Sequence, residues 1–213
     1  MNLKKHLDRA AQAMERGQPD FAIELCDQVM EFAPGEQRAA ELLTEAALAG
    51  KDAKGGFLKK LGAGPAGLAA RFSKLTRNPD AEARQLRRAF LKNPDDVAKG
   101  LDWGDALERA GYAGAALGVF SRLGQVSSEA AKRAGALAAA QGDVDQAIAY
   151  YGEALERNPR DTEAMRARKN LAAEQALRTK KYDDDESGAS GLDSEAFLRA
   201  ARGEDLGDGE DEA

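Results

Sequence analysis

The feature that most constrains this chain is a pattern of small and apolar residues that occurs twice with a step of 31 residues and again near the N-terminus. Residues 142–159 contain a turn glycine, one amphipathic helix and a closing proline. Glycine adopts positive φ at little cost, the apolar residues recur at helical spacing along one stripe, and Pro159 displaces the preceding residue from the α region. The equivalent positions in three copies of the pattern are Gly142, Ala147, Ile148, Tyr151 and Ala154; Gly111, Ala116, Leu117, Phe120 and Leu123; and Gly17, Ala22, Ile23, Cys26 and Val29. Such a period predicts an all-α array of stacked helical hairpins.

The pattern resembles the tetratricopeptide repeat family, whose unit is a pair of antiparallel helices, A and B. In that family a Leu-Gly or similar pair lies within helix A, a glycine turns the chain into helix B, helix B carries an aromatic residue, and a proline closes the unit. Trp103-Gly104 and Ala134-Gly135 stand where the helix A pair belongs. The step of 31 residues is shorter than the usual 34 of the family, and two serines at 127–128 replace one closing proline. The resemblance implies a helical-hairpin repeat solenoid.

The resemblance also divides the chain into segments. The best-matching units span 97–127 and 128–161, whereas 3–35 and 63–96 match in part. A helix expected over 36–49 either opens a further unit or caps the first hairpin. The four predicted segments are 1–50 with N-terminal repeat-like helices, 51–66 as a basic glycine-rich hinge, 67–182 with repeats and a C-terminal capping helix, and 183–213 as a disordered acidic tail.

The net charge of −6 is unevenly distributed along the chain. Residues 183–213 hold 12 acidic and 2 basic residues, so they carry −10 and leave +4 for residues 1–182. A segment this acidic and this poor in apolar residues cannot bury enough surface to fold alone. Within it, residues 192–202 have a short apolar face and predict a helix that forms on binding, because so short a helix is marginal in water.

Residues 50–77 are basic, with a net charge of +6, and contain several glycines. Residues 62–67 spell G-x-G-x-x-G, but no predicted strand precedes them and no βαβ unit surrounds them, so they do not predict a nucleotide site. Two interpretations remain. We favour a hinge with degenerate repeat helices over a basic amphipathic surface for anionic lipid or nucleic acid.

The sequence lacks the residues from which common catalytic and metal sites are built. It contains one histidine, His6, and one cysteine, Cys26, whereas metal sites with these ligands need several of them. We therefore predict no catalytic residue, no metal and no cofactor, and a protein that is not an enzyme. A single cysteine excludes an intrachain disulfide and is typical of a reducing compartment. Because no apolar run approaches the roughly 18 residues of a membrane span, we expect a cytoplasmic protein.

The predicted function is that of a scaffold or adaptor whose A helices line a groove for a peptide or helix of a partner protein. Seven side chains are predicted to point toward that groove: Asp102, Asp105, Arg109, Lys132, Arg133, Arg166 and Asn170. Their order predicts a groove that changes from acidic to basic toward the C-terminus. Some family members hold a partner's C-terminal carboxylate with Lys and Asn at set helix A positions, and the matching positions here do not carry that set.

No motif identifies the protein partner, self-association through the N-terminal face stays open, and no small-molecule substrate is expected. The alternative is a peripheral membrane- or nucleic-acid-binding protein that uses residues 50–77, with the acidic tail as an internal competitor. Salt separates these hypotheses, because binding to phosphate groups weakens steeply as salt rises. In a variant of the adaptor hypothesis, residues 192–202 fold back into the groove beside Lys132, Arg133 and Arg166.

Overall fold

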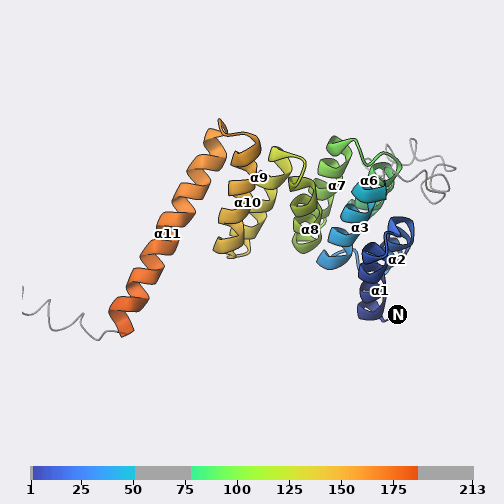
Figure 1. The fold of residues 1–213 in the computed structure, drawn as a ribbon, viewed down its shortest axis with the longest axis horizontal. Helices are drawn as coiled ribbons and strands as arrows, with labels where there is room; N and C mark the ends of the chain where they lie inside the picture. Colours follow the sequence, from blue (N-terminus) through green and yellow to red (C-terminus); the bar gives the residue numbers. More distant parts are fainter. Residues whose placement is uncertain (1, 51–77, 187–213) are drawn as a thin grey trace, which may run out of the picture. The chain divides into compact units, whose positions relative to one another are not determined.

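The computed structural model describes residues 2–50 and 78–186 of the 213-residue chain, with side chains up to Leu177. The regular elements in these ranges are all α-helices (Figure 1): α1 (Leu3–Glu15), α2 (Pro19–Phe32), α3 (Gln37–Ala49), α6 (Pro79–Lys92), α7 (Val97–Arg109), α8 (Ala113–Gly124), α9 (Ser128–Ala140), α10 (Val144–Arg157) and α11 (Thr162–Glu186). The chain separates into two compact units, and the second begins at Lys169, within α11.

Several predicted segments lie outside the described residues: the hinge at 51–66, the remainder of the basic stretch, and the short helix at 192–202. At the C-terminal end, α11 continues to Glu186 and so includes four residues that the sequence assigned to the acidic tail.

Helical hairpins repeat along the chain as the sequence pattern predicts. α1 packs against α2, α7 against α8, and α9 against α10. Each of these hairpins turns at a glycine with positive φ, at +67° for Gly17, +84° for Gly111 and +82° for Gly142. Residues with a side chain rarely adopt positive φ, whereas glycine does so readily. For the described residues, the prediction of an all-α fold built from repeated helical hairpins is therefore confirmed.

Within a hairpin, a small residue of the first helix makes room for a bulky residue of the second. A Cβ atom on Gly104 of α7 would overlap the ring of Phe120 on α8, and a Cβ atom on Gly135 of α9 would lie 3.0 Å from the ring of Tyr151 on α10. In the first hairpin the equivalent positions hold Ala10 and Cys26, and both are fully buried. In this hairpin Cys26 of α2 is smaller than the aromatic residue of the other hairpins, and this leaves room for the methyl group of Ala10 on α1.

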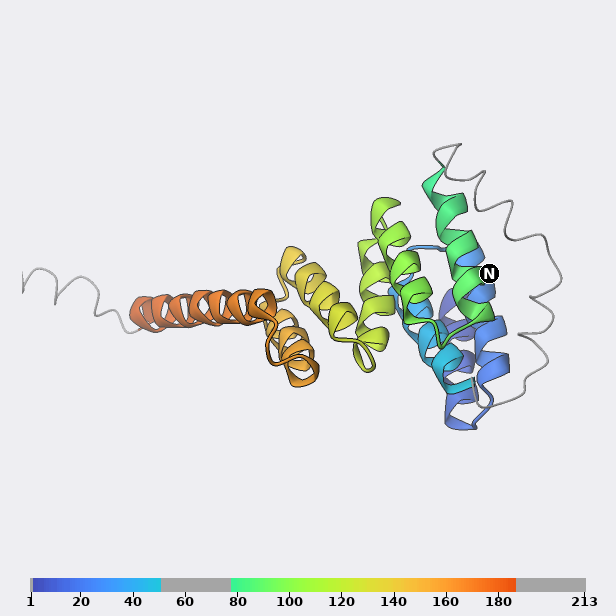
Figure 2. The ribbon, with the colours of Figure 1, turned by 90° about the horizontal axis from the view of Figure 1, so that it is seen from above.

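The neighbours of α3 differ from those of a regular array. α3 packs against α2 and also against α8, which lies far along the sequence. The approach is close, because a Cβ atom on Gly118 of α8 would lie 2.6 Å from the carbonyl oxygen of Gln37. α8 in turn packs against α7, and α7 against α6 (Figures 1 and 2). α3 therefore connects the N-terminal hairpin to the later repeats, in addition to covering that hairpin.

A buried arginine joins α6 to α2. The Arg87 side chain is 2% exposed, its Nε lies 2.9 Å from Oδ1 of Asp27, and its Nη2 donates a hydrogen bond to Glu31. On the same helix Phe90 is buried, whereas Leu86 is only half-buried. The helix is turned so that Arg87 faces inward, which is tolerated because two carboxylates compensate its charge.

Candidate functional site

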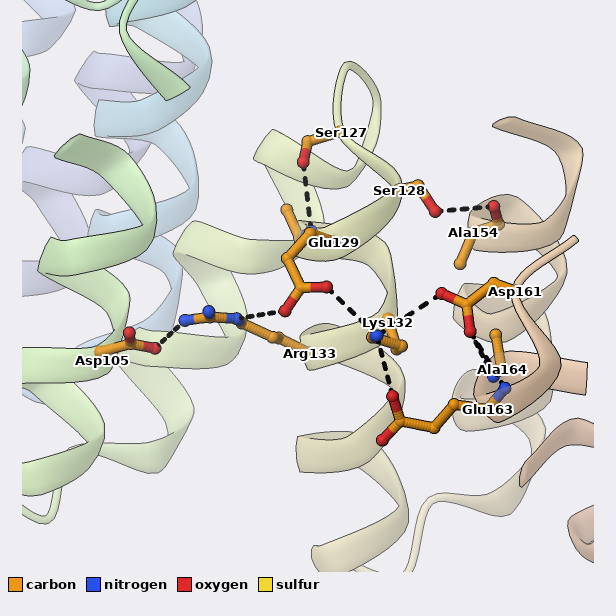
Figure 3. Close-up of polar contacts among 11 residues, drawn as sticks. Asp105, Ser127, Ser128, Glu129, Lys132, Arg133, Ala154, Asp161, Glu163 and Ala164 are labelled. Atoms are coloured by element: carbon orange, nitrogen blue, oxygen red, sulfur yellow. Dashed lines mark hydrogen bonds and ion pairs between the residues drawn. The ribbon is translucent and has the colours of Figure 1, made fainter. Parts of the chain in front are cut away.

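The predicted groove residues of α7 and α9 are connected by ion pairs. Arg133 of α9 donates a hydrogen bond through Nη1 to Asp105 of α7, and a second through Nε to Oε1 of Glu129 at 3.0 Å (Figure 3). Its guanidinium carbon also lies 5.7 Å from the centroid of the Phe120 ring, within the range of a cation–π contact. Arg133 therefore links two adjacent helices and rests on the hydrophobic core.

Lys132 extends this chain of charges to the start of α11. Its Nζ lies 2.9 Å from Oε2 of Glu163, 3.2 Å from Oε2 of Glu129 and 3.4 Å from Oδ2 of Asp161 (Figure 3). Only 20% of the Lys132 side chain is exposed. We call the whole set the ion-pair ladder. Its six members are Asp105, Glu129, Lys132, Arg133, Asp161 and Glu163.

Two helix caps hold the ladder in place. Oγ of Ser127 accepts a hydrogen bond from the backbone N–H of Ala130, so the serine that replaces a closing proline caps α9. Oδ1 of Asp161 accepts a hydrogen bond from the N–H of Ala164 at 3.0 Å, while its other oxygen faces Lys132. Asp161 thus fixes the first turn of α11 and the ion pair to α9 at once.

The ladder stabilises the charged forms of Lys132, Glu129 and Asp161. The hydrogen bond to Glu163 is the main reason that the pKa of Lys132 is raised. Partial burial acts to raise the pKa of Glu129, but hydrogen bonds from Arg133 and Lys132 outweigh it and lower that pKa. Backbone hydrogen bonds at the start of α11, together with the charge of Lys132, lower the pKa of Asp161.

The predicted change from an acidic to a basic groove is not found along the ladder. Four carboxylates and two cations give the ladder a net charge of −2. Lys132 and Arg133, which the sequence placed at the basic end, each pair with at least two acidic side chains. These two residues therefore present little free positive charge to an acidic ligand.

The other predicted groove residues are exposed. Asp102 lies on the surface of α7, and Arg109 at the end of that helix pairs with Glu82 of α6, with Nη2 2.9 Å from Oε1. Arg166 is exposed on α11. Asn170 is exposed on the same helix, in the part that belongs to the second compact unit.

A pocket lies between α1 and α3, the first and third helices of the N-terminal segment. It has a volume of about 290 Å³ and opens to solvent. Its lining combines three apolar and three charged side chains: Ala11, Met14, Glu15, Arg38, Leu42 and Glu45. We call it the α1–α3 pocket.

Three ion pairs order one side of this pocket. Arg38 Nη1 lies 2.9 Å from Oε2 of Glu41. Arg122 of α8 approaches the same helix, with its Nε 3.6 Å from Oε2 of Glu45 and its Nη2 4.0 Å from Glu41. The packing of α3 against α8 therefore positions Glu45 at the pocket.

Sequence reasoning did not identify the α1–α3 pocket as a site, although part of the signal was present. The apolar residues at helical spacing in the sequence include Ala11 and Met14 in α1 and Leu42 in α3. Leu42 is buried, but Ala11 and Met14 remain half-buried because no described helix covers them completely. The pocket arises where two predicted apolar stripes meet without closing.

The single histidine and the single cysteine have structural environments. Nδ1 of His6 lies 2.9 Å from the backbone oxygen of Asn2, in the first turn of α1. Cys26 is fully buried, and its burial raises the pKa of the thiol to about 12. Within residues 2–50 and 78–186, no three His, Cys, Asp or Glu side chains are grouped as metal ligands. The same ranges contain no helix that is both long and apolar enough to cross a membrane.

No protein-family model matches the sequence, and no curated protein matches it. Among solved structures, a crystal structure of MamA is 15% identical, covers 88% of this chain and 96% of its own, and has a TM-score of 0.43. TTC0263, a thermophilic TPR protein of Thermus thermophilus, is 19% identical over 80% of this chain and 99% of its own, with a TM-score of 0.41. YrrB, described as a TPR protein with an unusual peptide-binding site, is 18% identical over 77% and 90%, with a TM-score of 0.41.

Identities and TM-scores at this level do not assign the chain to a family, so we describe its fold class from its own geometry. That geometry comprises hairpins that turn at equivalent glycines, and helices that approach closely where a glycine meets an aromatic ring. By these features the protein is a helical-hairpin repeat protein.

Proposed function

We propose that the protein is a non-catalytic scaffold or adaptor that binds a peptide or helix of a partner protein. The observation that carries this proposal is the α1–α3 pocket, which combines an apolar floor with a charged rim on two helices. Protein-binding surfaces commonly place an apolar anchor at their centre and polar groups around it. The packing of α3 against both α2 and α8 gives such a surface a rigid support.

The size of the pocket suits one side chain of a partner. A cavity of about 150 Å³ is enough to hold benzene, so about 290 Å³ accommodates one large aliphatic or aromatic side chain. Pockets for small-molecule ligands usually range from about 300 to 1,000 Å³ and enclose most of the ligand. A solvent-open pocket just below that range favours a peptide side chain over a metabolite.

We also propose that the residues predicted from the sequence contact a partner. In the first compact unit these are Asp102, Asp105, Arg109, Lys132, Arg133 and Arg166, and in the second unit Asn170. Asp105, Lys132 and Arg133 are fixed by the ion-pair ladder. They would present an ordered pattern of charge without further loss of side-chain entropy. Asp102 and Arg166 are exposed and would be available for direct hydrogen bonds to a partner.

The alternative function depends on residues 50–77, most of which lie outside the described residues. It is a peripheral association with anionic lipid or nucleic acid, driven by the net charge of +6 in that stretch. Such binding would weaken steeply with salt and would not respond to a change in the α1–α3 pocket. The adaptor proposal also places the protein in the cytoplasm, where a single unpaired cysteine is common.

The test is affinity capture from native extract with the full-length chain and two variants. Ala11→Trp fills the α1–α3 pocket from its half-buried wall, and Ala149→Trp adds the same side chain at an exposed position of α10. We expect a set of proteins that is retained by the wild type and Ala149→Trp at moderate salt and lost with Ala11→Trp. Capture of only nucleic acid or lipid, removed by salt and indifferent to Ala11→Trp, would contradict the adaptor function.

A further inference from the structure

We infer that the α1–α3 pocket selects a partner segment in which a large apolar side chain stands next to a lysine or arginine. This inference rests on the proposed adaptor function and specifies the chemistry of its ligand. It follows from two features of the same pocket: an apolar floor that accommodates one side chain, and a rim with two carboxylates and one cation, whose net charge is negative.

The floor of the pocket is apolar and belongs to both helices. Met14 and Ala11 of α1 are half-buried, and Leu42 of α3 is 2% exposed. Covering this surface with a partner side chain removes apolar area from water, which favours binding in proportion to that area. The floor supplies affinity for an apolar residue but does not choose among its neighbours in the partner sequence.

The rim makes that choice through its charges. Glu15 and Glu45 line the pocket from opposite helices, together with one cation, Arg38. Arg38 is engaged by Glu41 at 2.9 Å, and Glu45 is approached by Arg122 at 3.6 Å. Within the described part of the chain no cation pairs with Glu15, so its carboxylate is the group that remains for a partner.

The ends of the two helices add to the negative potential. Glu15 is the last residue of α1, and Glu45 lies about one turn before the end of α3. The last turn of each helix contains no basic residue; Arg16 follows α1, but it does not line the pocket. Unpaired carbonyl groups at a helix C-terminus carry partial negative charge and favour a nearby cation. A carboxylate at the end of α1 costs that helix stability, whereas a cationic partner would turn the same arrangement into a binding determinant.

Selection from a random peptide library tests the inference with the full-length chain as bait. We expect the selected peptides to share a Leu, Ile, Met or Phe with an adjacent Lys or Arg. One selected peptide is then measured by fluorescence anisotropy, beside a copy in which the basic residue is replaced by norleucine. The protein variants are Ala11→Trp, Glu15→Gln, and Glu24→Gln as a matched control at an exposed position of α2.

The expected pattern is specific to one pair of groups. Ala11→Trp should abolish binding of both peptides. Glu15→Gln should weaken the basic peptide by about two- to fivefold, the range of a solvent-accessible ion pair, and leave the norleucine peptide unchanged. Glu24→Gln should change neither.

Two other outcomes overturn the inference in different ways. Selected peptides that are blocked by Ala11→Trp but carry no basic residue, or that bind equally to wild type and Glu15→Gln, would refute the charge selection and leave the adaptor function standing. Selection of no peptide that Ala11→Trp blocks would refute both.

Discussion

Removal of the buried charge at Arg87 should destabilise the fold more than the same substitution at its neighbour Arg88. The structure provides a matched pair, because both arginines approach Glu31. The side chain of Arg87 is 2% exposed, whereas that of Arg88 is 55% exposed and lies 3.7 Å from the same carboxylate. Arg87→Met keeps most of the buried hydrocarbon and removes the guanidinium group.

The expected magnitude follows from what Arg87→Met leaves behind. Loss of one partner of a fully buried ion pair costs about 3–5 kcal/mol, because the other charge stays buried and uncompensated. Here Asp27 and Glu31 keep 23% and 34% exposure, so water can solvate them in part, and we expect about 2–3 kcal/mol. At about 2–4 °C per kcal/mol for a domain of this size, the melting temperature should fall by roughly 4–12 °C. Arg88→Met should cost about 0–1 kcal/mol, as an exposed pair does.

The assay is urea unfolding followed by helical circular dichroism. A further variant separates charge from packing: Arg87→Met combined with Asp27→Asn and Glu31→Gln should recover part of the lost stability, because the stranded charges are gone. Arg87→Met that loses no more stability than Arg88→Met would refute the role assigned to this arginine.

Three further predictions concern the repeats and the ladder. Gly104→Ala should lose about 1–3 kcal/mol in urea unfolding, because its methyl group would overlap the Phe120 ring; a second change, Phe120→Leu, should restore part of that loss, and no restoration would argue against the overlap. Cys26, whose burial raises the thiol pKa to about 12, should resist a thiol reagent at mildly alkaline pH in the native protein and react fast in urea, and equal rates would contradict its burial. Arg133→Met should destabilise the protein at neutral pH but less in acid. Because the pKa of Glu129 is lowered in the folded protein, its ion pair with Arg133 stabilises the fold above the ordinary pKa of a carboxyl group. That stabilisation is lost as the pH falls through the pKa of Glu129 in the folded state. A stability loss that does not change with pH would count against the ladder.

The hairpins could be predicted from the sequence because their signals are local. Gly17, Gly111 and Gly142 each needed only a turn residue at a fixed offset from an apolar stripe, and all three have positive φ in the structure. The pairing of a helix A glycine with a helix B aromatic residue was also visible in the repeat. The physical reason for this pairing, the close approach of the ring to the backbone of helix A, is visible only in the structure.

The ion pairs of the ladder were not predicted from the sequence. The helix positions of Asp105, Lys132 and Arg133 predicted side chains that point toward a groove, but not that these charges pair with others. The distance along the chain held the missing signal: Lys132 and Glu163 are 31 residues apart, which is the repeat step, and Arg133 and Asp105 are 28 apart. Residues about one repeat apart lie on equivalent helices of neighbouring repeats, so opposite charges at that spacing predict an ion pair.

The remaining features depend on packing between distant segments. Nothing local in the sequence shows that Arg87 of α6 pairs with two carboxylates of α2. The contact of α3 with α8 joins helices that are distant in the sequence, and the apolar stripe of α3 does not indicate which helix covers it. The α1–α3 pocket follows from that placement, so it could not be predicted before the structure.

The most direct test of the adaptor function is a photo-crosslinking phenylalanine analogue placed at position 14, in the floor of the α1–α3 pocket, with position 149 on α10 as the control. Irradiation in the native cell should give discrete protein adducts from position 14, and these should disappear in the Ala11→Trp background. We expect none of them from position 149. The same adducts from both positions, or adducts from position 14 that persist with Ala11→Trp, would contradict the assignment of partner binding to this pocket.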